Sequence, residues 1–348
     1  MSYVAVIFHG FGSPGFSGEK EVALQAIKAL EERGVEFKVV SFSRPRNTDY
    51  DVVYVSPFVI RRFDKYQRLL TVLKARKLRP KLFLNMSGTL VKLSDIAPHV
   101  VYMGAFAFTT PSKYERSLFW RLYLLPFKKV ITSQLEEAKH ARVIANSKYS
   151  AKKMVPFLGY EPEVIYPPIT NYDLYSRAYH ERERERAMLT IGRFERGKFL
   201  ENSIEVAKAL GVRLYLVGSL TDRKYFKYLQ NLARGADVVF IPNAPPEKVA
   251  ELLSRVSVYF HPTIGEHFGM PVAESMLAGV VPVAPKESGA SELVPEFSYS
   301  DLEDAKEKVK QALESPVALR REMRERVKGL RPEIFREELF ERLRLYLG

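Results

Sequence analysis

The chain has 348 residues, of which 46% are hydrophobic and 27% are charged. This composition is typical of a large globular protein, with enough apolar surface for two domains that each have a core. The chain has no cysteine, which excludes disulfides, a thiolate metal site and a cysteine nucleophile. Its net charge of +13 is compatible with nucleic acid, anionic lipid or small anionic substrates as partners.

The amino terminus carries no signal-peptide pattern. Residues 1–7 lack a basic start and enter an apolar run at once. No segment reaches the roughly 18 to 20 apolar residues of a membrane-spanning helix. We therefore expect a cytoplasmic protein.

Short apolar runs alternate with helical patterns along the chain. In the first half, strands are predicted at 3–8, 36–42, 51–56, 81–85, 99–103 and 142–145. After Pro167 and Pro168 the alternation restarts, with strands predicted at 188–191, 213–217, 237–241, 257–260 and 280–283. Such alternation is typical of parallel α/β sheets. We predict two doubly wound domains that bind ligand at the carboxyl ends of their strands.

A glycine-containing loop follows the first predicted strand. Gly10, Gly12 and Gly15 match the Gly-x-Gly-x-x-Gly pattern of dinucleotide-binding folds. Pro14 crowds the turn, however, and no acidic residue closes the second predicted strand, which ends in Ser41-Phe42-Ser43-Arg44. A hydride-transfer enzyme is therefore disfavoured.

Residues 113–129 mix aromatic, leucine and cationic side chains and contain the only tryptophan of the chain, Trp120. This mixture is typical of a helix that lies on an anionic membrane surface. An ordinary buried helix with charged flanks explains the same pattern, and Pro126 limits the length of either helix. Both interpretations stay open, and the first predicts peripheral membrane contact through 113–129.

Two charged motifs receive no functional role. Asp49-Tyr50-Asp51 matches an Asp-x-Asp metal motif, but it lies at the start of a predicted strand and zinc-type histidine spacings are missing, so no metal is assigned. The alternating Glu and Arg residues at 181–186 are predicted to form a solvated connection.

Cations line a predicted strand-to-helix turn in the second half. The strand at 187–191 runs into Gly192 and Arg193, and Lys198 follows before the next helical pattern. Arginine offers a planar fork and lysine a compact point charge, a pair that suits a diphosphate. In a chain with 54 Lys and Arg residues, solvated loop charges alone explain the same cluster.

Two carboxylates bracket a later strand-to-helix segment. Glu266 and Glu274, with seven residues between them, flank a glycine-containing loop, and Pro271 is placed to begin a helix. The unpaired N–H groups and the dipole of that helix suit a diphosphate, while ionised carboxylates accept hydrogen bonds from hydroxyls. For Glu274 the alternative is a side chain that only complements the helix dipole. A glycosidase acid and nucleophile pair is the alternative chemistry.

Together these motifs resemble those of GT-B glycosyltransferases of family 4, whose donor half carries a Gly-Arg…Lys element followed by Glu, seven residues and Glu. The chain matches this pattern at Arg193, Lys198, Glu266 and Glu274. The sequence Glu-His-Phe-Gly that starts at Glu266 is similar to mannosyltransferases that extend lipid-linked oligosaccharides from GDP-mannose. The resemblance implies an α/β GT-B fold with two doubly wound Rossmann-like domains facing a central cleft.

The resemblance implies roles for domains and residues. It places an acceptor-binding domain at 1–167, a donor-binding domain at 168–330 and a helix at 331–348 that packs back on the first domain. By analogy, Arg193 and Lys198 hold the diphosphate and Glu266 holds the transferred sugar as the catalytic candidates. The remaining donor-binding candidates are Glu274 for the ribose and Gly192, His267, Phe268, Gly269 and Met270, while Gly15, Ser17 and Gly18 belong to the glycine-rich loop.

The implied function is that of a retaining hexosyltransferase. Mannose would pass from GDP-mannose to a hydroxyl of a glycan or polyprenyl-linked acceptor, without metal or other cofactor. The alternatives are a UDP- or ADP-sugar-dependent relative and a basic, non-enzymatic protein that binds nucleotide or nucleic acid. The chain shows no zinc-finger spacing or RNP-like pattern, so nucleic acid is not the expected partner.

The acceptor side lacks the subgroup's histidine. Met103-Gly104-Ala105-Phe106 stands where those mannosyltransferases have a histidine-containing turn. His9 and His99 lie near strand ends but match no motif, and a lone histidine there is interpreted as structural.

Overall fold

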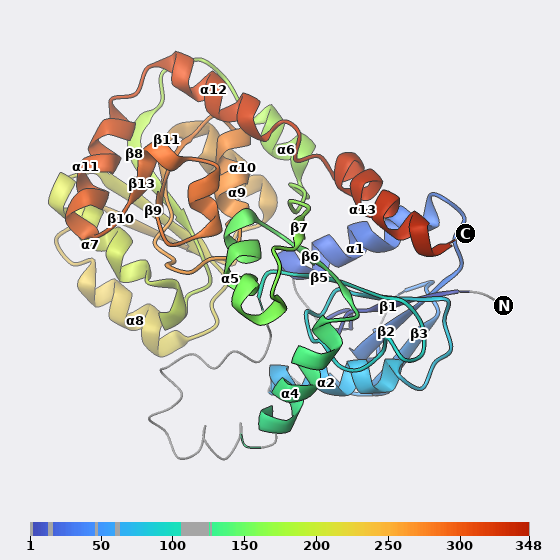
Figure 1. Ribbon diagram of the computed structural model, residues 1–348. Helices are drawn as coiled ribbons and strands as arrows, with labels where there is room; N and C mark the ends of the chain where they lie inside the picture. Colours follow the sequence, from blue (N-terminus) through green and yellow to red (C-terminus); the bar gives the residue numbers. More distant parts are fainter. Residues whose placement is uncertain are drawn as a thin grey trace. The chain divides into compact units, whose positions relative to one another are not determined.

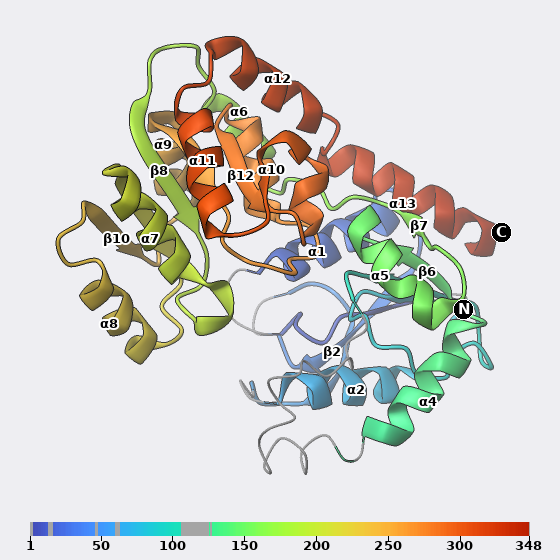
Figure 2. The ribbon, with the colours of Figure 1, turned by 60° about the vertical axis from the view of Figure 1, so that its left-hand side comes forward.

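The computed structural model describes residues 3–347 apart from 13–16, 46–47, 60–62, 106–124 and 126. The chain divides into two compact units, the first formed by Met1–Pro168 with Glu333–Gly348 and the second by Ile169–Pro332. Each unit is built on one parallel sheet with helices packed on its faces, as Figures 1 and 2 show.

Among the described residues, the first unit has a seven-stranded sheet in the order β3-β2-β1-β4-β5-β6-β7. Its strands are β1 (Val4–Ile7), β2 (Phe37–Ser43), β3 (Val52–Ser56), β4 (Leu82–Asn85), β5 (His99–Met103), β6 (Arg142–Ala145) and β7 (Glu163–Val164). Its helices include α1 (Gly18–Glu31), α2 (Asp64–Ala75), α4 (Phe127–Ala138), α5 (Lys148–Leu158) and α13 (Pro332–Leu347). The order of strands reverses between β1 and β4, which makes that point the expected ligand position of the sheet.

Helix α13 belongs to the first unit although it ends the chain. Phe335, Leu339 and Leu343, four residues apart, form one apolar stripe and are buried in the core that contains Ile27 and Leu30 of α1. The stripe explains why the last helix packs beside α1 in Figures 1 and 2.

Within the described residues, the second unit has a six-stranded sheet in the order β10-β9-β8-β11-β12-β13. Its strands are β8 (Glu185–Ile191), β9 (Arg213–Gly218), β10 (Val238–Pro242), β11 (Val256–Phe260), β12 (Val281–Pro285) and β13 (Ser298–Tyr299). Its helices include α6 (Tyr172–Arg177), α7 (Leu200–Leu210), α8 (Arg223–Leu232), α9 (Pro246–Arg255), α10 (Met270–Leu277), α11 (Leu302–Leu313) and α12 (Val317–Val327). The reversal of strand order lies between β8 and β11.

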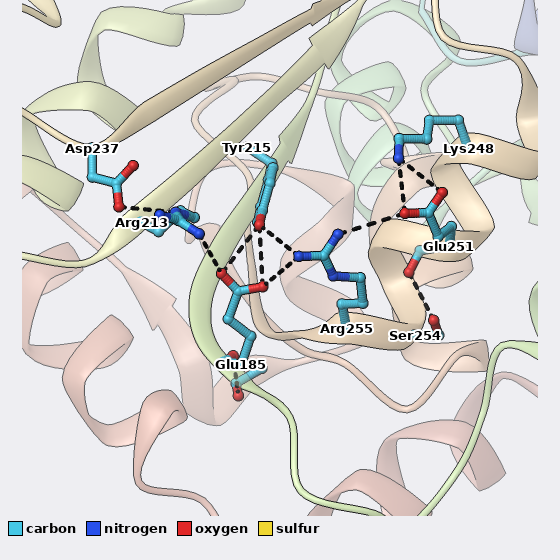
Figure 3. Close-up of polar contacts among 9 residues, drawn as sticks. Glu185, Arg213, Tyr215, Asp237, Lys248, Glu251, Ser254 and Arg255 are labelled. Atoms are coloured by element: carbon cyan, nitrogen blue, oxygen red, sulfur yellow. Dashed lines mark hydrogen bonds and ion pairs between the residues drawn. The ribbon is translucent and has the colours of Figure 1, made fainter.

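Polar side chains at the amino ends of β8 and β9 contact residues that directly precede β10 and β11 (Figure 3). The Glu185 carboxylate, at the start of β8, accepts hydrogen bonds from the Tyr215 hydroxyl at 3.1 Å and from Arg255 Nη2 at 3.1 Å. Arg213 contacts the same carboxylate at 3.4 Å and donates from Nε to Asp237 at 2.8 Å. The network therefore connects the amino ends of these strands. The loops with the predicted donor residues follow the opposite, carboxyl ends of the strands.

The prediction that 181–186 is a solvated connection is wrong for three of its residues. Glu185 and Arg186 begin β8, and Arg184 is buried. The Arg184 guanidinium donates to the carbonyls of Leu253 and Ala278, both at 2.6 Å, at the carboxyl ends of α9 and α10. Helix ends leave carbonyls without partners inside the helix, and a buried arginine supplies the missing donors.

Arg184→Ala should lower the free energy of unfolding by about 2–4 kcal/mol, because it leaves buried carbonyl groups without donors. Arg186→Ala is the matched control, since Arg186 is exposed, and it should change stability by less than about 0.5 kcal/mol. Urea unfolding followed by circular dichroism measures both. Equal losses in the two variants would contradict this role of Arg184.

Candidate functional site

The predicted donor residues lie on two loops that leave adjacent strands. The loop at 192–199 follows β8, and the loop at 261–269 follows β11, its parallel neighbour. Thr190 Oγ1 in β8 donates to the Phe260 carbonyl in β11 at 2.8 Å, which joins the strands just before the loops begin. Both loops therefore emerge at the reversal point of the sheet, where ligands bind in open α/β folds.

The first loop needs glycine where its backbone approaches another strand end. A Cβ built on Gly218, at the end of β9, would lie 1.8 Å from the Gly192 carbonyl oxygen. The loop then forms a short 3-10 turn at Arg196–Lys198, and Phe199 adopts a left-handed conformation, with φ of 51°, before α7. This path directs Lys198 toward the second loop.

The cations of the first loop have different partners. Lys198 Nζ forms an ion pair with Glu266 Oε2 at 2.7 Å and joins the two loops directly. Arg193 Nη2 contacts Glu195 at 3.0 Å, and its side chain is 59% exposed. Arg196 lies over the rings of Tyr225 and Tyr228, so it attaches the loop to α8. The structure thus brings Lys198 and Glu266 together and leaves Arg193 at the surface.

Glu266 is ionised in this environment. Burial opposes its charge, but the Lys198 ammonium outweighs burial and lowers the pKa of Glu266 to about 2. The carboxylate therefore accepts hydrogen bonds and does not donate them at neutral pH. A sugar hydroxyl is a suitable donor to it.

The start of α10 depends on Gly269. This residue has φ of 86°, which favours glycine, and its carbonyl accepts the N–H groups of Val272 and Ala273. Met270 is the first residue of the helix, one position before the predicted start at Pro271. His267 is exposed and Phe268 is buried in the core, so only the former lies at the surface of the loop.

Glu274, unlike Glu266, has no nearby cation among the described residues that offsets the effect of burial on its pKa. The residue is 7% exposed, and burial raises the pKa of its carboxyl to about 7. Burial and then the charge of Glu274 raise the pKa values of Tyr175 and Tyr259, so both phenols lie near this carboxyl. Glu266 and Glu274 therefore differ in protonation near neutral pH.

The structure adds His261, which the sequence interpretation did not consider. It follows β11 directly and is 3% exposed, and its Nε2 atom has no hydrogen-bond partner among the described residues. Burial first, and then the charge of Lys198, lower its pKa to about 4 although Glu266 opposes them, so the ring is neutral. Its position directly after a buried strand and five residues before Glu266 is the sequence signal for it.

The glycine-rich loop is described in part. Gly15 lies outside the described residues. The Ser17 hydroxyl accepts the N–H of Lys20 at 3.2 Å and caps α1, whose first residue is Gly18. Of the predicted membrane segment 113–129, residues 113–124 and 126 also lie outside the described part.

The described residues form a surface cavity, but they form neither a metal-binding group nor a membrane-spanning helix. A surface cavity of about 690 Å³ beside edge strand β3 is lined by Arg44, Pro45, Thr48, Tyr50, Val52, Tyr54, Pro57, Phe58 and Val59, none of them a donor candidate. In the described ranges, no group of three His, Asp or Glu side chains could hold a metal ion. A helix long and apolar enough to cross a bilayer is not found there either.

Comparison with known proteins identifies the family of the donor residues. Residues 172–329 match the family model described as glycosyl transferases group 1. The second unit belongs to this family. The match contains both loops, and it confirms the resemblance that the Arg193 to Glu274 pattern indicates.

Two curated proteins that this chain resembles are mannosyltransferases by name. An alpha-1,3/1,6-mannosyltransferase, ALG2, of Rhizomucor pusillus is 26% identical over 223 residues, which cover 50% of this chain and 48% of the relative. A GDP-Man:Man(3)GlcNAc(2)-PP-Dol alpha-1,2-mannosyltransferase of Dictyostelium discoideum is 28% identical over 158 residues, which cover 38% of this chain and 31% of the relative. The aligned parts are thus less than half the length of each relative.

The fold resembles solved structures over nearly the whole chain. WaaG, a glycosyltransferase involved in lipopolysaccharide biosynthesis, superposes with a TM-score of 0.71 at 16% identity and covers 97% of this chain and 99% of its own. The predicted fold class, α/β with two Rossmann-like domains of the GT-B type, is confirmed.

Glu274→Gln should change the pH dependence of stability. Because the pKa of Glu274 rises from 4.5 to about 7 on folding, the folded state holds an extra proton between these values, and wild-type stability falls as pH rises through that window. Relative to wild type, Glu274→Gln should therefore gain up to about 3 kcal/mol between pH 4.5 and pH 7.

Urea unfolding at pH 5 and pH 8 measures this gain. Glu205→Gln is the control, because Glu205 is exposed on α7 in the same unit. A difference between wild type and Glu274→Gln that stays constant with pH would show that the Glu274 carboxyl titrates normally.

Proposed function

We propose that the chain is a retaining hexosyltransferase that moves mannose from GDP-mannose to a hydroxyl of a lipid-linked glycan. The ion pair between Lys198 and Glu266, at the reversal point of the second sheet, carries this proposal. An ammonium and a carboxylate lie 2.7 Å apart in this pair, which supports a site where a cation faces a diphosphate and a carboxylate faces sugar hydroxyls. The names of the two mannosyltransferase relatives support the choice of sugar, nucleotide and acceptor.

In the proposed binding mode, the diphosphate contacts Lys198, Arg193 and the amino terminus of α10. The exposed Arg193 can turn from Glu195 to a phosphate, because the side chain is held by one surface ion pair. The Glu266 carboxylate binds hydroxyls of the transferred sugar. Glu274 binds the ribose hydroxyls, and Gly192 and Gly269 allow the backbone to approach the ligand closely.

The proposed reaction uses the departing phosphate as the base. The bond between the anomeric carbon and the diphosphate oxygen breaks, and the acceptor hydroxyl oxygen bonds to the same face of that carbon. The acceptor proton passes to the phosphate oxygen that leaves. Lys198, Arg193 and the α10 terminus stabilise the charge that develops on the diphosphate, so the proposal requires no metal ion and no covalent nucleophile.

The name of one relative supports the proposed acceptor. That relative acts on a glycan carried by PP-Dol, as its name states. We place the reaction of this chain at the cytoplasmic face of a membrane, with 113–129 as the segment of contact.

Lys198→Met should lower the turnover of GDP-mannose about 100-fold or more, because it removes a cation that stabilises the leaving group. Lys224→Met is the matched control, since Lys224 is exposed on α8 in the same unit and should leave turnover unchanged. Release of GDP, with and without a glycan acceptor, measures turnover.

The variant Lys198→Met also leaves the Glu266 carboxylate without its ammonium partner. Urea unfolding of Lys198→Met measures the cost to stability separately, and turnover should fall far more than stability does. If turnover fell only as far as the loss of folded protein explains, Lys198 would be structural and the proposed role would be wrong.

A further inference from the structure

A second polar network lies at the reversal point of the first sheet. His9 follows β1 and Ser87 follows β4, the two strands between which the strand order reverses. Glu19 in the first turn of α1 and Asp64 and Arg68 in the first turns of α2 complete the network. Four separate segments of the first unit thus place polar side chains at the position where an open α/β sheet binds ligand.

The hydrogen bonds of His9 define its tautomer. Its Nδ1 atom lies 3.1 Å from Ser87 Oγ, and its Nε2 atom lies 3.1 Å from Asp64 Oδ1. Ser87 Oγ already accepts the backbone N–H of His9 at 2.9 Å, so its own proton is available to Nδ1. The Nε2 atom therefore carries the ring proton and donates it to Asp64.

Arg68 fixes the same carboxylate from the other side. Its Nε atom donates to Asp64 Oδ2 at 2.8 Å, and its Nη1 atom donates to the Ser87 carbonyl at 2.8 Å. Its Nη2 atom donates to Glu19 at 3.0 Å. Because the guanidinium is planar, these contacts together set the orientation of Asp64.

Asp64 and Glu19 are the exposed members of this network. Their side chains are 65% and 59% exposed, whereas those of His9 and Arg68 are 6% and 17% exposed. Partial burial opposes the charge of Asp64, but the hydrogen bond from His9 and the charge of Arg68 hold the pKa of Asp64 well below its usual range. Each oxygen of Asp64 accepts one donor from the described residues and keeps capacity for another, so the group can accept a hydrogen bond from a ligand hydroxyl.

We propose that the Asp64 carboxylate, held by His9 and Arg68, binds a hydroxyl of the saccharide acceptor. His9 and Arg68 act as positioning residues, because their atoms contact Asp64 and not the ligand. A hydroxyl is a suitable donor to this carboxylate, because an ionised carboxylate only accepts hydrogen bonds. The inference rests on the proposed transferase function and adds an acceptor-binding residue to the first unit, where the subgroup's histidine is missing.

A direct binding experiment tests this proposal without the donor. The free oligosaccharide Man(3)GlcNAc(2) serves as the probe and is titrated into the full chain by calorimetry. Asp64→Asn should weaken its binding about tenfold or more, because a hydrogen bond to a charged group is lost. Asp95→Asn is the matched control, since it breaks another Arg–Asp pair of the first unit, with Arg76, outside the network of His9 and Asp64.

His9 variants separate positioning from folding. His9→Gln keeps an amide N–H that can reach Asp64, so it should retain most of the affinity for the oligosaccharide, whereas His9→Leu should lose it. In transfer assays the same losses should raise the KM for the oligosaccharide and leave the KM for GDP-mannose unchanged.

Equal oligosaccharide affinity in wild type and Asp64→Asn would overturn the proposal, and so would a wild-type chain that does not bind the oligosaccharide. Failure of wild type to bind GDP would contradict the proposed donor instead. The two failures are distinguishable because the oligosaccharide titration contains no nucleotide.

Discussion

The parallel pairing of β8 with β11 is the constraint on which the donor site depends. It brings the carboxyl ends of two strands that are far apart in sequence side by side. Glycines then let the loops approach their neighbours, since a Cβ on Gly289 would lie 1.9 Å from the His267 carbonyl oxygen. The positions of the two loops bring Lys198 and Glu266 together as an ion pair. A shift of either loop would separate the two side chains.

The two glutamates of the motif show how environment gives one residue type two behaviours. Lys198 overcomes the effect of burial and keeps Glu266 ionised, with a pKa of about 2. Glu274 has burial without a compensating charge, and its pKa rises to about 7. In the proposed function, Glu266 accepts hydrogen bonds throughout the neutral range, whereas Glu274 also exists there as a neutral acid that can donate one.

The sequence predicts the fold class because its main strands are continuous apolar runs between helical patterns. It does not predict β7 or β13, since two residues carry no periodicity. Each half of the donor motif is local, with Arg193 and Lys198 on one loop and Glu266 and Glu274 on another loop and its helix, and each half can therefore be recognised in the sequence. The contacts of Arg184 with α9 and α10, and of His9 with Asp64, join residues more than fifty positions apart, and only the folded chain brings them together.

The proposed function requires that the second unit bind a nucleoside diphosphate through Lys198. Calorimetric titration of the wild-type chain and of Lys198→Met with GDP, UDP and ADP, at one fixed ionic strength, measures this binding. Wild type should select GDP, and Lys198→Met should lose most of this affinity. No binding of any of the three, together with tight, salt-sensitive binding of nucleic acid, would contradict the proposed function and make the net charge of +13 the main indication of function.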